Sequence, residues 1–290
     1  GWGKMESFFD KYINTIERTE PIKYTGSVIA VKGLMIECNG PRSVIGEICT
    51  IHVDSLKTNV LAEVVGLEDN IIRLMAFGET RGIEIGSVVV ASGHVLEVPV
   101  GKQLLGRVID ATGKPCDDLG ELVPETYYPA VASAPNPMTR KPINKRITTG
   151  VRAIDSLLTV GKGQRIGIFA GSGVGKSTLL GTIARNSDAD VNVIGLIGER
   201  GREVLDFIDL DLGKEGLKRS VVVVATGDQP AICRVRAAYV CTAIAEYFRD
   251  KGKVVVLMID NVTRFAKAQQ EIGTSNGELP IKGGYPPSVF

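Results

Sequence analysis

Residues 165–180 read RIGIFAGSGVGKSTLL, and this stretch decides the fold. The apolar run 165–170 is followed by a glycine-rich turn and then by a segment with helical spacing. That order of strand, loop and helix is typical of a phosphate-binding P-loop, although Ala170 stands where the strict pattern has its first glycine. The residues predicted to surround the phosphates are Gly171, Ser172, Gly173, Val174, Gly175, Lys176, Ser177 and Thr178.

The residue types in this turn explain why phosphate is the expected ligand. Glycines let backbone N–H groups curl around an anion, and the following helix directs its positive end to the same place. Lys176 is predicted to reach the β- and γ-phosphates, and the hydroxyl of Ser177 is predicted to bind Mg²⁺. The alternative is a chance glycine-rich turn, which the flanking strand and helix patterns disfavour.

The chain beyond Gly150 alternates apolar runs with helical stretches. Apolar runs cover residues 165–170, 191–197, 220–225 and 254–259, and the longest helical stretch covers residues 230–250. Strands that are apolar on both faces and separated by helices are typical of a parallel sheet covered on both sides. We therefore predict an α/β domain with its ligands at the carboxyl ends of the strands.

Two further motifs follow apolar runs and supply acidic side chains. Asp260 ends the run 254–259 and is predicted to hold Mg²⁺, although an Asp after a strand is commonly a helix cap. Glu199 and Arg200 follow the run 191–197, where a carboxylate can activate water and an arginine can stabilise developing charge. The alternative for Glu199 and Arg200 is a surface ion pair.

The first half of the chain has a different pattern. Short β-rich runs between residues 24 and 98, separated by glycines, predict a small antiparallel barrel. It lacks the interleaved aromatic and basic residues of a nucleic-acid stacking surface, so a structural or assembly role is favoured. Residues 5–18 have the spacing of an amphipathic helix, packed on its own domain or docked on a partner. Residues 99–149 are rich in proline and predict an irregular connecting segment.

Composition excludes several classes of protein. The 290 residues carry 34 Lys and Arg and 33 Asp and Glu, a net charge of +1, which disfavours a nucleic-acid partner. No apolar run approaches the ~18 residues of a membrane-spanning helix, and the first twenty residues lack the apolar core of a secretory signal. The five cysteines are irregularly spaced, which predicts reduced thiols in a cytoplasmic protein rather than a zinc site.

Longer motifs resemble a known family. AGSGVGKSTLL (170–180), LIGERGREV (196–204), DNVTRFAKAQQEIG (260–273) and GYPPSVF (284–290) closely resemble the flagellar and type III secretion export ATPases, relatives of the rotary ATP synthase catalytic subunit. The resemblance implies an α/β fold with a RecA-like P-loop core and a parallel sheet, preceded by a small antiparallel β-barrel. It implies an N-terminal helix at 1–20, the barrel at 21–98 and an incomplete ATPase core at 99–290.

The resemblance also implies roles for individual residues. Lys176 and Ser177 would hold the phosphates of ATP and Mg²⁺, with Asp260 as a further Mg²⁺ ligand. Glu199 would activate water, and Arg200 would contact the γ-phosphate. Non-catalytic rotary subunits carry Gln at the position of Glu199, so a catalytic subunit is favoured.

By the same resemblance the protein would form a homohexamer at the cytoplasmic face of a membrane export apparatus. Residues 5–18 would bind a stator or regulator protein, and the ring would meet the export gate and export substrates or chaperones, with no nucleic acid. Peripheral association with the membrane is compatible with this arrangement. Flagellar and virulence-type export are not separated by the motifs.

The chain also departs from the family pattern. Gln270 stands where the family usually has Arg, and residues 274–283 interrupt a familiar loop. The chain stops at Phe290, before the family's arginine finger, adenine-stacking residues and C-terminal helical domain. An arginine finger contributes about 10³ to 10⁵ in rate, so we expect these 290 residues alone to hydrolyse ATP poorly or not at all.

Other functions fit parts of the same pattern. A catalytically inactive nucleotide-binding assembly module would keep the P-loop without turnover. A rotary ATP synthase-type catalytic subunit shares most motifs, although GERGREV (198–204) and Ser177 are closer to the export ATPases. A hexameric helicase-type motor is disfavoured by the near-neutral charge.

Overall fold

A computed structural model of the chain describes residues 13, 16, 22–171 and 173–290. Ile13 and Ile16 are helical, and the rest of the helix predicted over residues 5–18 lies outside the described residues. The chain divides into two compact units, residues 1–95 and 96–290, where the sequence analysis divided it after Val98.

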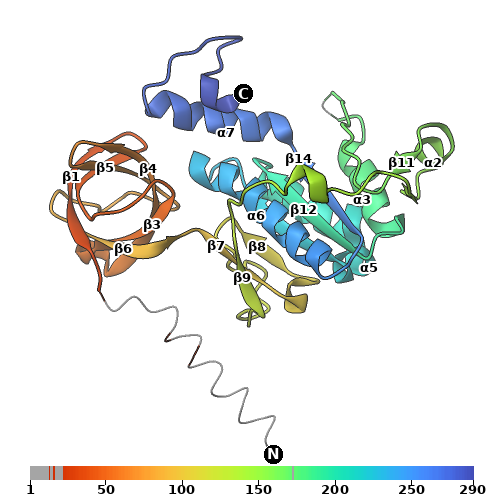
Figure 1. Cartoon of the computed structure of the whole chain (residues 1–290), viewed down its shortest axis with the longest axis horizontal. Helices are drawn as coiled ribbons and strands as arrows, with labels where there is room; N and C mark the ends of the chain where they lie inside the picture. The colour runs from red at the N-terminus through yellow and green to blue at the C-terminus, as the bar shows by residue number, and fades with distance from the viewer. Residues whose placement is uncertain (1–12, 14–15, 17–21, 172) are drawn as a thin grey trace, which may run out of the picture. The chain divides into compact units, whose positions relative to one another are not determined.

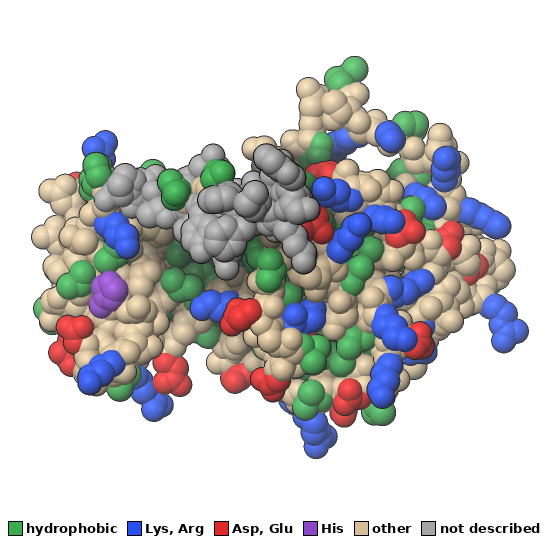
Figure 2. Space-filling model, turned by 90° about the horizontal axis from the view of Figure 1, so that it is seen from below, with side chains coloured by type: hydrophobic (Ala, Val, Ile, Leu, Met, Phe, Trp, Pro, Cys, Tyr) green, Lys and Arg blue, Asp and Glu red, His purple; other side chains and the backbone are tan. Residues whose placement is uncertain are grey.

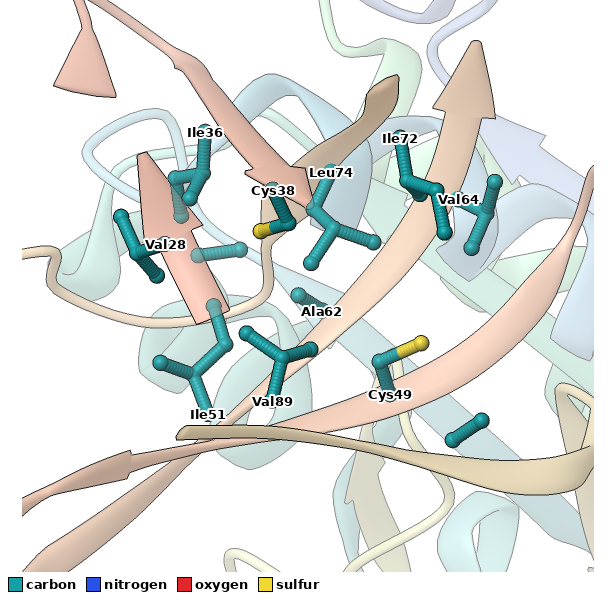
Figure 3. Packing of buried hydrophobic residues seen from close by; sticks show 12 residues of the cluster. Val28, Ile36, Cys38, Cys49, Ile51, Ala62, Val64, Ile72, Leu74 and Val89 are labelled. Atoms are coloured by element: carbon teal, nitrogen blue, oxygen red, sulfur yellow. The ribbon is translucent and has the colours of Figure 1, made fainter. Parts of the chain in front are cut away.

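The first unit is a closed antiparallel barrel, as predicted, with strand order β1-β2-β5-β4-β3-β6 (Figure 1). Its strands are β1 (Thr25–Lys32), β2 (Met35–Asn39), β3 (Glu47–Val53), β4 (Thr58–Glu68), β5 (Ile71–Ala76) and β6 (Val88–Val95), with the short 3₁₀ helix η1 (Asp54–Leu56) between β3 and β4. Because alternate residues of a strand point to opposite faces, one apolar set fills the interior. Figure 3 shows this core, in which Ile36, Ile51 and Leu74 are fully buried.

The second unit contains a four-stranded parallel sheet in the described residues, with strand order β14-β12-β13-β8. Its strands are β8 (Val108–Asp110), β12 (Val191–Ile197), β13 (Ser220–Ala225) and β14 (Val255–Asp260). Its longer helices are α3 (Lys176–Asn186), α6 (Ala231–Asp250) and α7 (Val262–Ser275). These strands and α6 lie where the sequence predicted them, except that β8 falls in the segment predicted to be irregular.

Helices cover both faces of this sheet, which confirms the predicted α/β architecture. Ile194 and Leu196 of β12 pack with α3, whereas Gly195 faces α6, where an added Cβ would meet the sulfur of Cys241 at 2.7 Å. Figure 1 shows α6 lying along the sheet. Every residue of β12 is buried, as expected of the sheet's central strand.

Shorter elements connect these parts of the second unit. The strands are β7 (Glu97–Val100) paired with β9 (Thr126–Pro129), and β10 (Arg146–Ile147) paired with β11 (Val160–Gly161). The α-helices are α2 (Arg152–Leu157), α4 (Gly201–Asp206) and α5 (Gly213–Lys218), with a π-helix η4 (Phe207–Leu212) and the 3₁₀ helices η2 (Lys102–Leu104), η3 (Pro137–Thr139) and η5 (Pro287–Val289). The side-chain amide of Gln270 in α7 donates to the carbonyl of Gly284 at 2.6 Å. This bond ties the loop that follows α7 to the helix.

Two sequence predictions need correction. Residues 99–149 are more regular than their prolines suggested, since β8 joins the sheet through Val108–Asp110, paired with residues 222–224 of β13. Residues 165–170 do not form the predicted strand: the run has no ladder partner among the described residues, and Phe169 is 98% exposed. A buried strand needs a neighbour to satisfy its backbone, and Gly167 further weakens a strand that lacks one.

Helix α3 packs closely on η4 through a glycine. A Cβ added to Gly181 would lie 2.5 Å from the carbonyl oxygen of Asp211, too close for any ordinary contact. Gly181→Ala is therefore expected to lower the free energy of unfolding by about 1–3 kcal/mol, although Ala is the better helix former. Urea denaturation measures the change.

Gly201→Ala is the matched control, because an added Cβ at this helical glycine meets nothing within 4 Å. We expect Gly201→Ala to be neutral or slightly stabilising. Equal losses in the two variants would contradict the close contact between α3 and η4.

The described surface is mixed in charge, and no helix of the described residues is long and apolar enough to cross a membrane. Figure 2 shows basic and acidic side chains interspersed on one face of the molecule. This distribution agrees with the net charge of +1.

Candidate active site

The phosphate-binding turn leads directly into α3. Gly173 and Gly175 have φ values of 74° and 91°, a left-handed backbone that glycine adopts without steric cost. Gly175 is the N-cap, and it has no side chain to bond the first N–H groups of the helix. These N–H groups and the positive end of the helix dipole are available to an anion.

The predicted phosphate-binding residues differ in how exposed they are. Gly171, Gly173, Val174, Gly175 and Thr178 are exposed at the turn, and Ser172 lies outside the described residues. Lys176 and Ser177, the first two residues of α3, are half-buried. The turn therefore presents a largely open surface to a ligand.

Lys176 reaches across from α3 to the end of β14. Its Nζ lies 2.5 Å from Oδ1 of Asp260, whose side chain is only 3% exposed. A buried carboxylate needs a partner to offset its lost hydration, and the Lys176 ammonium group supplies it. The P-loop lysine and the predicted Mg²⁺ ligand are thus in direct contact, although 84 residues separate them in sequence.

Asp260 is not the helix cap that the alternative interpretation suggested. The cap of α7 is Asn261, whose Oδ1 accepts a hydrogen bond from the N–H of Arg264 at 2.9 Å. The carboxylate of Asp260 is therefore free of capping.

Glu199 follows β12 at the same edge of the sheet, because Leu196 of β12 is in register with Asp260 of β14. Its Oε2 lies 3.2 Å from Nη1 of Arg264, and its Oε1 accepts a hydrogen bond from Nδ2 of Asn261 at 3.5 Å. Arg264 also donates to the carbonyl of Gly198. Asn261, the N-cap of α7, and Arg264 in its first turn therefore hold the Glu199 carboxylate beside the end of β14.

The surroundings of Glu199 change its acidity. Burial, a hydrogen bond with Glu203 and the charge of Asp260 together raise the pKa of Glu199 from 4.5 to about 7, and Arg264 opposes them. The same hydrogen bond lowers the pKa of Glu203, because the ionised Glu203 carboxylate accepts it. A carboxylate with a pKa near neutrality is suited to accept a proton from water.

Arg200 lies differently from the other predicted site residues. Its side chain is 84% exposed, and its guanidinium pairs with Glu203 at 3.3 Å. Arg200 therefore forms a surface ion pair, but with Glu203 and not with Glu199 as the alternative interpretation had it. The structure brings Lys176, Asp260 and Glu199 to one edge of the sheet and leaves Arg200 at the surface.

Asn261 and Arg264 were not among the site residues predicted from the sequence. The signal that could have revealed them is the segment DNVTRF at 260–265, which places a capping residue and a cation in the first turn of a helix that follows a strand. A cation in the first turn is unfavourable to the helix dipole, so its presence there suggests a local partner. That partner is Glu199.

The donor set fits Mg²⁺ accompanied by a nucleotide. Mg²⁺ in phosphate-transfer sites is held by one or two protein oxygens, substrate phosphates and waters. Asp260 supplies a carboxylate and Ser177 a hydroxyl, both near the start of α3. Among the described residues, no group of three or more His, Cys, Asp or Glu side chains could hold a metal ion alone, so phosphate and water would complete the shell.

Comparisons with known proteins give a consistent result. Residues 28–93 match the beta-barrel domain of the ATP synthase alpha/beta family, and residues 150–290 match its nucleotide-binding domain. Over 97% of the chain, the sequence is 56% identical to a flagellum-specific ATP synthase of Treponema pallidum (strain Nichols). Over 96% of the chain, it is 58% identical to that of Bacillus subtilis (strain 168). The chain spans 63% and 64% of these two proteins, less than two thirds of their length.

Secretion ATPases are similar as well. A type 3 secretion system ATPase of Xanthomonas euvesicatoria is 52% identical over 91% of the chain and is 60% covered by it. The assembled ATPase EscN of enteropathogenic E. coli, solved in complex with its central stalk EscO, has a TM-score of 0.84 at 44% identity. That match covers 91% of this chain and 64% of the EscN chain.

Proposed function

The chain belongs to the ATP synthase alpha/beta family, and we propose that it forms the nucleotide-binding part of an Mg²⁺-dependent ATPase for protein export through a flagellar or type III secretion apparatus. The observation that carries the chemistry is the position of Glu199. This half-buried carboxylate, with a pKa of about 7, lies at the edge of the sheet where Lys176 meets Asp260. A rotary synthase-type subunit shares the fold, and the relatives named flagellum-specific ATP synthase and type 3 secretion system ATPase favour the export function.

In the proposed binding step, phosphate oxygens accept hydrogen bonds from the N–H groups at the start of α3 and from the ammonium group of Lys176. Lys176 thereby leaves Asp260, with which it pairs in the nucleotide-free structure. The released Asp260 carboxylate and the Ser177 hydroxyl would then hold Mg²⁺. Held there, Mg²⁺ would supply positive charge that offsets the negative charge of the phosphate groups. Gly171, Ser172, Gly173, Val174, Gly175 and Thr178 would complete the cradle.

In the proposed hydrolytic step, ionised Glu199 orients a water molecule and accepts its proton as the water oxygen bonds to the γ-phosphorus. The bond between the γ-phosphorus and the β–γ bridging oxygen breaks, and ADP leaves with that oxygen. Arg264 and Asn261 act on this step by holding the Glu199 carboxylate. Arg200 would contact the γ-phosphate only after it releases Glu203, because the two are paired in this structure.

Assembly and location belong to the same proposal. The solved relative EscN is assembled and carries a central stalk. By analogy this chain would form a homohexamer at the cytoplasmic face of an export apparatus, with residues 5–18 toward a stator or regulator and with the export gate and substrates or chaperones as further partners. The domain limits 1–20, 21–98 and 99–290 are part of this proposal.

Two measurements separate binding from catalysis. Equilibrium titration of this chain with a fluorescent ATP analogue, with and without Mg²⁺, tests the nucleotide site. Turnover is tested in a chimera that joins Phe290 to the part of the Bacillus subtilis relative beyond the match. Binding without turnover in the chimera would favour the inactive assembly module.

The pH dependence of turnover follows from the raised pKa of Glu199. The free protein must lose the Glu199 proton before this carboxylate can accept one from water, so kcat/KM of the chimera is expected to rise about tenfold per pH unit below about 7 and then level off. The same proton is held more tightly in the folded chain than in the unfolded one. The free energy of unfolding should therefore fall as pH rises from 4.5 to about 7.

Glu203→Gln tests the cause of this shift. Removing the Glu203 carboxylate removes a group that raises the pKa of Glu199, so the rising limb of the kcat/KM profile should move to lower pH. A profile that stays in place would show that the Glu199–Glu203 interaction does not set the limb.

A further inference from the structure

The guanidinium group of Arg219 hydrogen-bonds to the C-terminal end of α3, the helix that follows the phosphate-binding turn. The residue lies just before β13 and is half-buried. Its Nη2 donates to the carbonyl of Ser187 at 2.7 Å and to the hydroxyl of the same residue at 3.0 Å, and its Nε donates to the carbonyl of Ala184 at 3.2 Å. These carbonyls belong to the last turn of α3 and its C-cap, where the helix leaves carbonyl oxygens without partners.

A buried polar network joins the same helix end to the sheet. Asn192 of β12, which is fully buried, donates from Nδ2 to the carbonyl of Ala184 at 2.8 Å and to the Ser220 hydroxyl at 3.3 Å. Ser220 in turn donates to the carbonyl of Gly216 at 2.6 Å. The first residues of two neighbouring strands are therefore bonded to one end of α3 or to α5 beside it.

The positive charge of Arg219 interacts with this end of α3. Its hydrogen-bond partners in the described part of the chain are two carbonyls and one hydroxyl, with no carboxylate among them. A cation at the C-terminus of a helix is favourable to the helix dipole. Because the guanidinium is a rigid planar group, bonds from two of its nitrogens also restrict rotation of the end of α3.

The opposite end of α3 carries Lys176 and Ser177. The helix has 11 residues and is therefore about 16 Å long, so a small tilt at one end displaces the other. Among the described residues, the segment 165–171 that leads into α3 pairs with no strand, and the start of the helix meets the sheet through the ion pair of Lys176 with Asp260. At the C-terminal end, Asn192 and Arg219 hydrogen-bond to the backbone carbonyls of the helix itself.

From this arrangement we infer that Arg219 is a positioning residue for nucleotide binding: by fixing the C-terminal end of α3 it sets where Lys176 and Ser177 meet the phosphates. The inference rests on the proposed nucleotide site. Arg219 touches no reacting atom and acts through the helix alone. Its loss leaves the P-loop residues in the chain but lets α3 shift on the sheet.

The test compares three variants of this chain by their Kd for a fluorescent Mg²⁺-ATP analogue, at a temperature where circular dichroism shows each to be folded. Arg219→Met keeps the length of the side chain and removes every donor. Arg219→Lys keeps the charge and removes the fork. Arg185→Met is the matched control, because it removes an equal charge from the last turn of α3 at an exposed position.

We expect Arg219→Met to weaken binding about tenfold or more, Arg219→Lys to weaken it less, and Arg185→Met to leave it unchanged. In Arg219→Ala, millimolar guanidinium should restore part of the affinity, and the same concentration of sodium should not. Recovery of affinity by a small cation distinguishes positioning from a general loss of folded protein.

Other outcomes overturn the inference. If the wild type binds and Arg219→Met binds equally well while folded, the helix end does not set the site. If Arg219→Met does not fold, Arg219→Lys decides, and unchanged affinity in that variant rejects the inference. If the wild-type chain binds no Mg²⁺-ATP, the proposed function fails and the inference falls with it.

Discussion

Glu199→Gln is expected to lower kcat for Mg²⁺-ATP hydrolysis by about 10²- to 10⁴-fold in the chimera while nucleotide affinity is retained. The amide is nearly isosteric and can still accept a hydrogen bond from Asn261, so the geometry of the β12 end should survive. What the amide lacks is the basicity to take a proton from water. Steady-state phosphate release and equilibrium binding measure the two quantities separately.

Glu215→Gln is the control for this experiment, because its side chain is 83% exposed on α5 and forms a surface pair with Lys218. Its turnover should equal that of the unmodified chimera. If Glu199→Gln turns over as fast as this control, Glu199 is not the base. Loss of binding together with turnover would instead indicate a structural role for Glu199.

Lys176→Ala should destabilise the nucleotide-free chain as well as weaken nucleotide binding. It leaves the Asp260 carboxylate, 3% exposed, without its cation. Breaking a buried ion pair at one partner costs about 3–5 kcal/mol, and because Lys176 is 29% exposed we expect about 3 kcal/mol. Adding Asp260→Asn should recover most of that stability, because the uncompensated charge is then removed. Urea denaturation of the single and double variants gives the coupling.

Lys218→Ala provides the comparison, since it breaks a surface pair with Glu215 at 2.7 Å. Such pairs contribute about 0–1 kcal/mol. An equally small loss for Lys176→Ala would mean that the Lys176–Asp260 pair does not form in the free protein. No recovery in the double variant would lead to the same conclusion.

Much of the fold follows from local patterns in the sequence. The barrel strands are short β-rich runs between glycine turns, and β12 and β13 are almost wholly apolar runs, so their type and approximate limits could be predicted. The 165–170 run shows where this reasoning fails. An apolar run specifies burial but not a partner strand, and this run pairs with no strand in the part of the chain that the structure describes. The strand β8 shows the opposite error, a strand that was not predicted. Its three residues become a strand only through pairing with β13.

Some residues of the candidate site could also be predicted from the sequence, and others could not. Lys176, Ser177, Asp260 and Glu199 could be predicted because each stands at the end of a strand or the start of a helix. Arg264 could not, because its role depends on the closeness of Glu199 from a different strand. The surface position of Arg200 could not be read from the motif either, since adjacent residues after a strand point in different directions.

The pairing of β8 with β13 also has a consequence for the order in which the chain folds. The barrel uses only strands between residues 25 and 95, and its ladders can close as soon as that stretch has left the ribosome. The parallel sheet cannot be completed then, because β8 must wait for residues 222–224 to be synthesised. Non-local pairing of this kind closes a long loop and slows folding. During synthesis the barrel is thus expected to be native while β8 is still unpaired.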